Sequence, residues 1–161
     1  MTKKEWISQP GELSRRIVFH AESLARLCRE ADAVFSRWGE GSSVRSTDAP
    51  YVRMLERIET LREQLEEETR LYDLLRIQVE EAVAALPQEK MRLVLLYHYL
   101  EGKSFPQIGN LLYMDKATAC RWAVRALEAL VLPENPVWFY SEKCNGCHQV
   151  SADATPAPVL Q

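Results

Sequence analysis

Apolar residues recur at alternating steps of three and four over two long segments of this chain. In the first, residues 12–38, the repeat is Leu13, Ile17, His20, Leu24, Leu27, Ala31, Val34 and Trp38. In the second, residues 51–86, it is Met54, Ile58, Leu61, Leu65, Tyr72, Leu75, Val79, Ala82 and Leu86. This spacing keeps one seam on one side of a helix, as in a coiled coil. The sequence therefore predicts two long amphipathic helices.

Each seam contains one polar exception. His20 is the polar member of the first seam, and Glu68 interrupts the second. We interpret His20 as a partly buried or seam-edge histidine, not as a ligand.

Residues 51–87 hold five arginines against eight glutamates and one aspartate. The acidic run "REQLEEETR" indicates a solvated outer face, which argues against contact with a phosphate backbone.

The segment between the two helices, "GEGSSVRSTDAP" at residues 39–50, is small, polar and closed by proline, so we expect a loop that lets the chain reverse. The two seams could then close on each other as an antiparallel α-hairpin, or pair with the same helices of a second chain. The sequence does not choose between a hairpin and a homodimer.

We divide the chain into residues 1–50, 51–86, 87–132 and a Pro-, aromatic- and Cys-containing tail at 133–161.

Composition limits the possible functions. The net charge is −3 and 47% of residues are apolar, so any nucleic-acid role must depend on a local patch. We expect no transmembrane segment and no secretory signal, and therefore a cytoplasmic protein with reduced thiols at Cys28, Cys120, Cys144 and Cys147. Scattered histidines, no Gly-rich phosphate loop and no nucleophile–base spacing argue against an enzyme.

A compact helical block follows Pro87, with expected helices at 89–101, 105–112 and 116–131. Gly102 suits the end of the first, and Ser104 with Gln107 forms the S-x-x-Q capping box of the second. We expect the second helix to present Phe105, Ile108, Leu111 and Leu112 to the core, with Gly109 where a helix can cross closely. Asp115 is the natural N-cap of the third helix.

The third helix has an apolar stripe and a polar one. The inward stripe is Ala119, Trp122, Ala123, Ala126, Leu127 and Leu130. The residues expected away from it are Lys116, Thr118, Arg121 and Arg125. From Lys103 to Ala126 there are four basic residues against one acidic, on a chain that is negative overall. This asymmetry is typical of a DNA-facing helix, although an ordinary packed bundle shows similar spacing.

Residues 85–130, "ALPQEKMRLVLLYHYLEGKSFPQIGNLLYMDKATACRWAVRALEAL", resemble region 4 of bacterial sigma-70-type sigma factors. The agreement lies in the leucine–proline start, the "G-x-S-x-x-x-I" second helix and the "T…R…RALE-L" third helix. With the long helices before it, the chain resembles small phage and prophage transcriptional regulators of Gram-positive bacteria. Nothing resembles sigma region 2, which argues against a stand-alone sigma factor.

The resemblance implies an all-α protein: a long N-terminal, coiled-coil-like helical hairpin followed by a helix-turn-helix domain that binds duplex DNA. It places Lys116, Ala117, Thr118, Cys120, Arg121 and Arg125 at base edges or phosphates. It places Ser104 and Gln107 at the DNA backbone, with Lys103 adding to the basic surface. So few basic residues imply weak binding, and hence a homodimer or an RNA polymerase partner. The alternative is a non-catalytic protein-interaction module that uses the hairpin, for example a polymerase-binding adaptor.

The segment "CNGCH" has the C-x-x-C-H spacing of haem attachment, a reaction that takes place outside the cytoplasm. Cys144, Cys147 and His148 could instead supply three zinc ligands, but a structural site needs four. We favour free thiols in a partly disordered tail and expect no cofactor.

Overall fold

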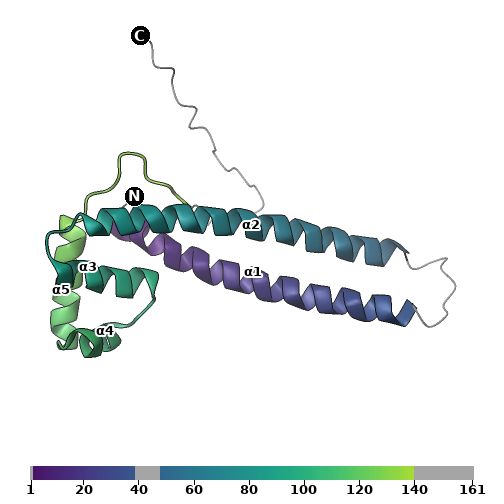
Figure 1. Cartoon of the computed structure of the whole chain (residues 1–161), viewed down its shortest axis with the longest axis horizontal. Helices are drawn as coiled ribbons and strands as arrows, with labels where there is room; N and C mark the ends of the chain where they lie inside the picture. The colour runs from purple at the N-terminus through teal and green to yellow at the C-terminus, as the bar shows by residue number, and fades with distance from the viewer. Residues whose placement is uncertain (1, 39–47, 140–161) are drawn as a thin grey trace, which may run out of the picture.

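The structure, a computed structural model, describes residues 2–38 and 48–139 (Figure 1). All regular secondary structure in these residues is helical, which confirms the all-α class. The elements are α1 (Lys3–Trp38), α2 (Asp48–Ala84), α3 (Glu89–Leu95), the π-helix η1 (Leu96–Leu100), α4 (Phe105–Leu112) and α5 (Lys116–Ala129). None of the helices in these residues is long and apolar enough to span a bilayer.

Helix α1 begins at Lys3, so the expected start at residue 12 is wrong. Thr2 begins the helix with a capping box, because its hydroxyl accepts the Glu5 N–H while the Glu5 carboxylate accepts the Thr2 N–H. Pro10 lies inside the helix and removes one backbone donor. Trp6, Ile7 and Pro10 are all fully buried, and their packing offsets the missing hydrogen bond.

Helices α1 and α2 run antiparallel, side by side (Figure 1). Every seam residue whose side chain the structure describes is buried or half-buried. Helix α2 starts at Asp48, so the last three residues of the expected loop are helical. Pro50 is tolerated there, because the N–H groups of a first helical turn have no intrahelical partner.

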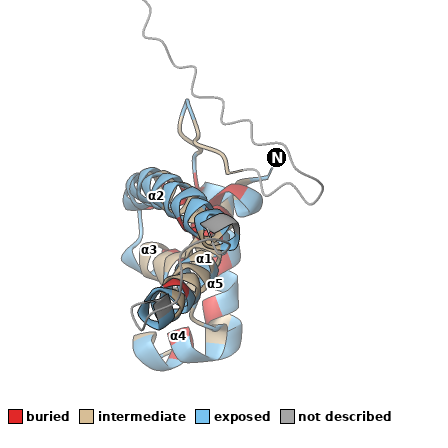
Figure 2. Ribbon diagram, turned by 90° about the vertical axis from the view of Figure 1, so that its right-hand side faces the viewer, coloured by how far each residue is buried: buried red, intermediate tan, exposed pale blue. Residues whose placement is uncertain are grey.

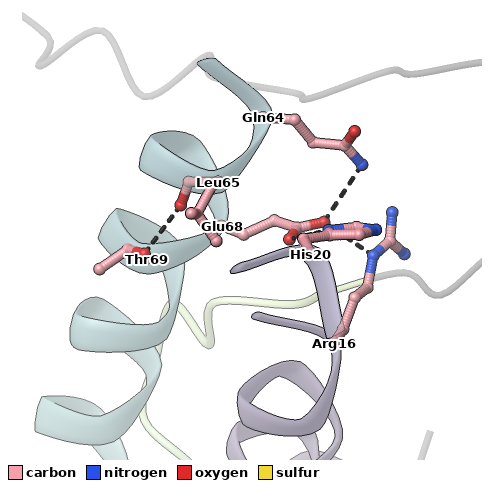
Figure 3. A network of polar contacts seen from close by, with 6 residues as sticks. All are labelled: Arg16, His20, Gln64, Leu65, Glu68 and Thr69. Carbon is pink, nitrogen blue, oxygen red and sulfur yellow. Dashed lines mark hydrogen bonds and ion pairs between the residues drawn. The ribbon is translucent and has the colours of Figure 1, made fainter. Parts of the chain in front are cut away.

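The two polar exceptions of the seams meet in one network (Figure 3). Glu68 lies on α2 and its side chain is buried. The predicted solvation of the acidic run is therefore wrong for this one residue. Its Oε1 lies 2.7 Å from Nε of Arg16, and its Oε2 accepts a hydrogen bond of 2.7 Å from Nδ1 of His20. Gln64, one turn earlier on α2, donates a longer bond of 3.4 Å to Oε1. The buried carboxylate is thus held from both helices.

The short helices α3, η1, α4 and α5 gather beside the start of α1 and the end of α2 (Figure 1). One core cluster joins the two parts: Trp6, Ile7, Val79, Val83, Leu86, Met91, Leu95, Ala126 and Leu130. A second lies among the short helices: Val94, Ile108, Ala119 and Ala123. Since α5 contributes to both clusters, its orientation is fixed relative to the long helices. Lys3 adds a direct tie, because its Nζ donates to the Glu128 carbonyl at 2.8 Å, near the end of α5.

The expected helix 89–101 changes character halfway. It is α-helical to Leu95 and then widens into η1, where the Glu101 N–H bonds to the carbonyl of Leu96 at 3.1 Å. A Cβ at Gly11 would lie 3.1 Å from the Tyr99 carbonyl oxygen, so the small residue in α1 permits close approach to this turn.

After α5 the chain returns across both long helices. The Gln78 amide donates to the Asn135 carbonyl at 3.0 Å, and the Phe139 N–H donates to Oε1 of Gln9 at 2.9 Å. Trp138 packs against the first core cluster. The described part of the aromatic segment is therefore docked on the two long helices.

Candidate nucleic-acid interface

Local hydrogen bonds set the start of α4. Gly102 has a left-handed φ of 67°, which glycine adopts at no steric cost. Gln107 Oε1 accepts the Ser104 backbone N–H at 2.9 Å and the Ser104 hydroxyl at 3.0 Å. The predicted capping box and the bounds of α4 are confirmed.

The core face of α4 is narrower than predicted. Ile108 is buried, and Phe105 and Leu112 are half-buried, but Leu111 is 48% exposed. The prediction for Leu111 is wrong, because each helical residue turns by about 100° and Leu111 falls on the flank of so short a helix.

The turn between α4 and α5 is wound closely around Gly109. The Met114 N–H bonds to the Gly109 carbonyl at 2.9 Å, and a Cβ on Gly109 would lie only 2.5 Å from the Met114 carbonyl oxygen. Gly109 therefore accommodates the returning turn, and the expected helix crossing is not its role. Tyr113 takes a left-handed φ of 54° there, which costs an L-residue roughly 1–2 kcal/mol.

Asp115 begins α5 as predicted. Its Oδ2 accepts the Thr118 backbone N–H at 3.2 Å, and its Oδ1 accepts the Thr118 hydroxyl. These two hydrogen bonds to the charged form lower the pKa of the Asp115 carboxyl below its ordinary range. The cap fixes the direction in which the first turn of α5 leaves the preceding turn.

Helix α5 is divided into a buried stripe and an open face (Figure 2). Ala119, Ala123 and Ala126 are buried inside the helix, and Leu130 is buried just after it. The helix ends at Ala129, since Leu130 is already extended with ψ of 132°, so the predicted end at 131 is two residues too late. Alanines on the inner side let the helix lie close to its neighbours.

Most of the predicted contact residues lie on the open side. Those exposed are Lys116, Ala117, Cys120, Arg121 and Arg125. Thr118 is only half-buried, and its hydroxyl is already engaged by Asp115. Val124, 51% exposed, shares this side, and sequence reasoning missed it. Helical spacing could have predicted the exposure of Val124, because steps of four and then three residues from Ala117 reach Arg121 and Val124 on the same side of α5.

The basic side chains of this face have no acidic partner in the part of the chain that the structure describes. No ion pair within residues 2–38 and 48–139 involves Lys116, Arg121 or Arg125. The Arg125 guanidinium lies 5.7 Å from the centroid of the Trp122 ring, and the Arg125 side chain is exposed. Lys103 differs, since its Nζ pairs with Glu101 at 2.8 Å.

The remaining residues predicted to contact DNA are less available for such a contact. Ser104 and Gln107 are exposed at the start of α4, but the Ser104 N–H and hydroxyl are both bonded to Gln107. A phosphate contact from Ser104 would exchange one hydrogen bond for another. Cys144, Cys147 and His148 lie outside the described residues. Within them, no group of three potential metal ligands is present.

An open groove of about 740 Å³ lies between one flank of α5, the start of α1, η1 and the start of α4. Cys120, Val124 and Leu127 line it from α5, and Lys3 and Lys4 from α1. That flank of α5 is therefore accessible.

No protein-family profile, curated protein or solved structure matches the chain. A function can therefore be inferred only from the geometry and charge of the residues themselves.

Proposed function

We propose that the chain is a sequence-specific, DNA-binding transcriptional regulator. In this proposal α4 and α5 form a helix-turn-helix of the sigma-70 region 4 type, α5 reads duplex DNA, and the long hairpin is a separate arm. The observation that carries it is the open face of α5, where Lys116, Arg121 and Arg125 are exposed and have no described acidic partner on a chain of net charge −3.

The chemistry of this face fits base readout. Arg121 lies in the middle of α5, with small or short side chains at Ala117 and Cys120 beside it. A guanidinium can bind guanine through two parallel hydrogen bonds, and such a pair discriminates by about 1–3 kcal/mol. Lys116 and Arg125 supply the phosphate contacts that fix register.

Three basic residues make a weak site, so the proposal includes a second contribution from a homodimer or from RNA polymerase. The seams of α1 and α2 are already occupied by each other, which leaves their outer faces for partners. The outer side of α2 exposes Val52, Leu55, Leu74 and Ile77. This observation favours the second candidate function, a protein-interaction module that binds through the hairpin.

One form of that alternative would have Arg121 and Arg125 neutralised by the acidic side of the hairpin. Neither arginine makes an ion pair with α2 in the described residues. The absence of this pairing keeps the α5 face available, so DNA binding remains the favoured function.

Selection of bound sequences from a pool of random duplexes tests the proposal. The wild type is expected to enrich one motif, and Arg121→Ala with Arg125→Ala to lose it. The matched control is Arg53→Ala with Arg57→Ala, which removes the same charge from exposed positions on α2. Equal enrichment by wild type and the Arg121/Arg125 variant, or no enrichment by wild type, would refute readout by α5.

A further inference from the structure

Tyr113 combines an unfavourable backbone conformation with an aromatic side chain that packs against almost nothing. Its φ is 54°, in the region that favours glycine, and its side chain is among the exposed apolar groups at 97%. No described hydrogen bond reaches its hydroxyl. The left-handed conformation belongs to the C-cap of α4, but the exposed ring adds almost no packing to the fold. An aromatic side chain in this strained position is therefore a candidate for a contact with a partner.

The backbone beneath this ring is held firmly. The N–H groups of Tyr113 and Met114 both bond to the Gly109 carbonyl, and the Asp115 cap follows directly. A side chain on this turn is thus presented from a rigid support. It stands three residues before Lys116, at the end of α5 that the proposed function brings to the DNA.

We propose that Tyr113 is a DNA-backbone contact, whose phenol hydroxyl donates a hydrogen bond to a phosphate beside the bases read by the first turn of α5. This inference rests on the proposed function. Tyrosine hydroxyls are regular phosphate donors, and the exposed phenol has no described internal partner to lose. Its two side-chain torsions also cost little entropy to fix. The contact adds affinity without sequence information or charge.

The test measures Kd for the selected duplex and for an unrelated duplex with Tyr113→Phe and Tyr113→Gly. Tyr113→Phe is expected to weaken both by roughly three- to tenfold, since one hydrogen bond is lost, with the selected motif and the salt dependence unchanged. Tyr113→Gly is expected to weaken binding at least as much while raising Tm by about 2–4 °C, because glycine relieves the strain. Phe35→Leu, at another exposed aromatic on α1, is the control and should leave Kd unchanged.

The outcomes separate the two proposals. If wild type selects a motif and Tyr113→Phe binds as tightly as wild type, the phosphate contact is refuted and the proposed function stands. The phosphate contact is equally refuted if only Tyr113→Gly loses affinity, since the hydroxyl would then be irrelevant. If wild type selects no motif, both proposals fail together.

Discussion

Nδ1 of His20 lies 2.7 Å from Oε2 of Glu68, so the polar residue in the seam of α1 meets the polar residue in the seam of α2. Arg16 completes the site from the edge, with a side chain 36% exposed against 8% for Glu68. A single polar layer within an apolar seam is satisfied in one alignment only. Arg16 and His20 lie one turn apart on α1, so sliding α1 by one turn would leave at most one of them opposite the buried carboxylate. We therefore expect the network to favour the observed register of the hairpin.

Replacing Glu68 alone should destabilise the hairpin. We expect Glu68→Ala to lower the free energy of unfolding by roughly 1–3 kcal/mol, since Arg16 and His20 lose their acceptor and a cavity opens. Urea titration followed by circular dichroism measures it. Glu67→Ala, exposed on the same helix, is the matched control and should stay within about 0.5 kcal/mol of wild type.

Removing the whole layer separates stability from register. A combined Arg16→Met, His20→Leu and Glu68→Leu variant should recover most of the stability lost in Glu68→Ala, because no buried charge remains unpaired. It should also populate alternative alignments or oligomers, detectable by light scattering after size exclusion. A strictly monomeric triple variant with wild-type hairpin contacts would show that the layer does not determine register.

The Asp115 cap gives α5 a defined dependence on pH. Since hydrogen bonds from Thr118 lower the pKa of the folded carboxyl, its stabilisation is fully present above the unfolded pKa and is lost as the pH falls through the folded one. Wild type should therefore exceed Asp115→Asn in Tm above about pH 5, and the difference should shrink below about pH 4. A Tm difference that does not change between acidic and neutral pH would contradict this role of the cap.

The two glycines around α4 should respond differently to alanine. At Gly102 nothing lies within 4 Å of an added Cβ, so Gly102→Ala should cost about 1 kcal/mol from the positive φ alone. At Gly109 the Cβ would meet a backbone oxygen, and we expect Gly109→Ala to cost more, up to about 3 kcal/mol. Equal losses in chemical denaturation would mean that the turn can relax away from Gly109.

The proposed interface also predicts how salt affects binding. Phosphate contacts by Lys116 and Arg125 would release about two counterions, so Kd should weaken on the order of tenfold between 50 and 200 mM salt. Anisotropy titrations of a labelled duplex give the slope. Arg125→Ala should reduce it by about one unit. A salt-independent Kd would argue against an electrostatic interface on α5.

Features with local causes could be predicted from the sequence. The bounds of α4 and the starts of α4 and α5 follow from Ser104, Gln107 and Asp115, because a cap bonds within three residues of itself. The exposure of Lys116, Arg121 and their neighbours follows equally from the apolar period of one helix.

Features with tertiary causes could not be predicted from the sequence. The Thr2–Glu5 capping box marks the true start of α1, but Pro10 and Gly11 together resemble a turn, and only burial of Trp6 and Ile7 makes the helix continuous. Likewise, the heptad pattern alone offers no means of choosing between hairpin and dimer, so the meeting of His20 and Glu68 could not be foreseen. The left-handed conformation of Tyr113 could not be foreseen either, because no glycine stands at that position of the turn.

Amide chemical shifts of the labelled protein, followed while the selected duplex is added, would locate the DNA-binding surface residue by residue. We expect the largest changes on Tyr113 to Arg125 and on Ser104 to Gln107, with residues 48–70 of α2 unaffected. Changes concentrated on α2, or none at all on α5, would contradict DNA reading by α5 and turn the search toward a protein partner of the hairpin.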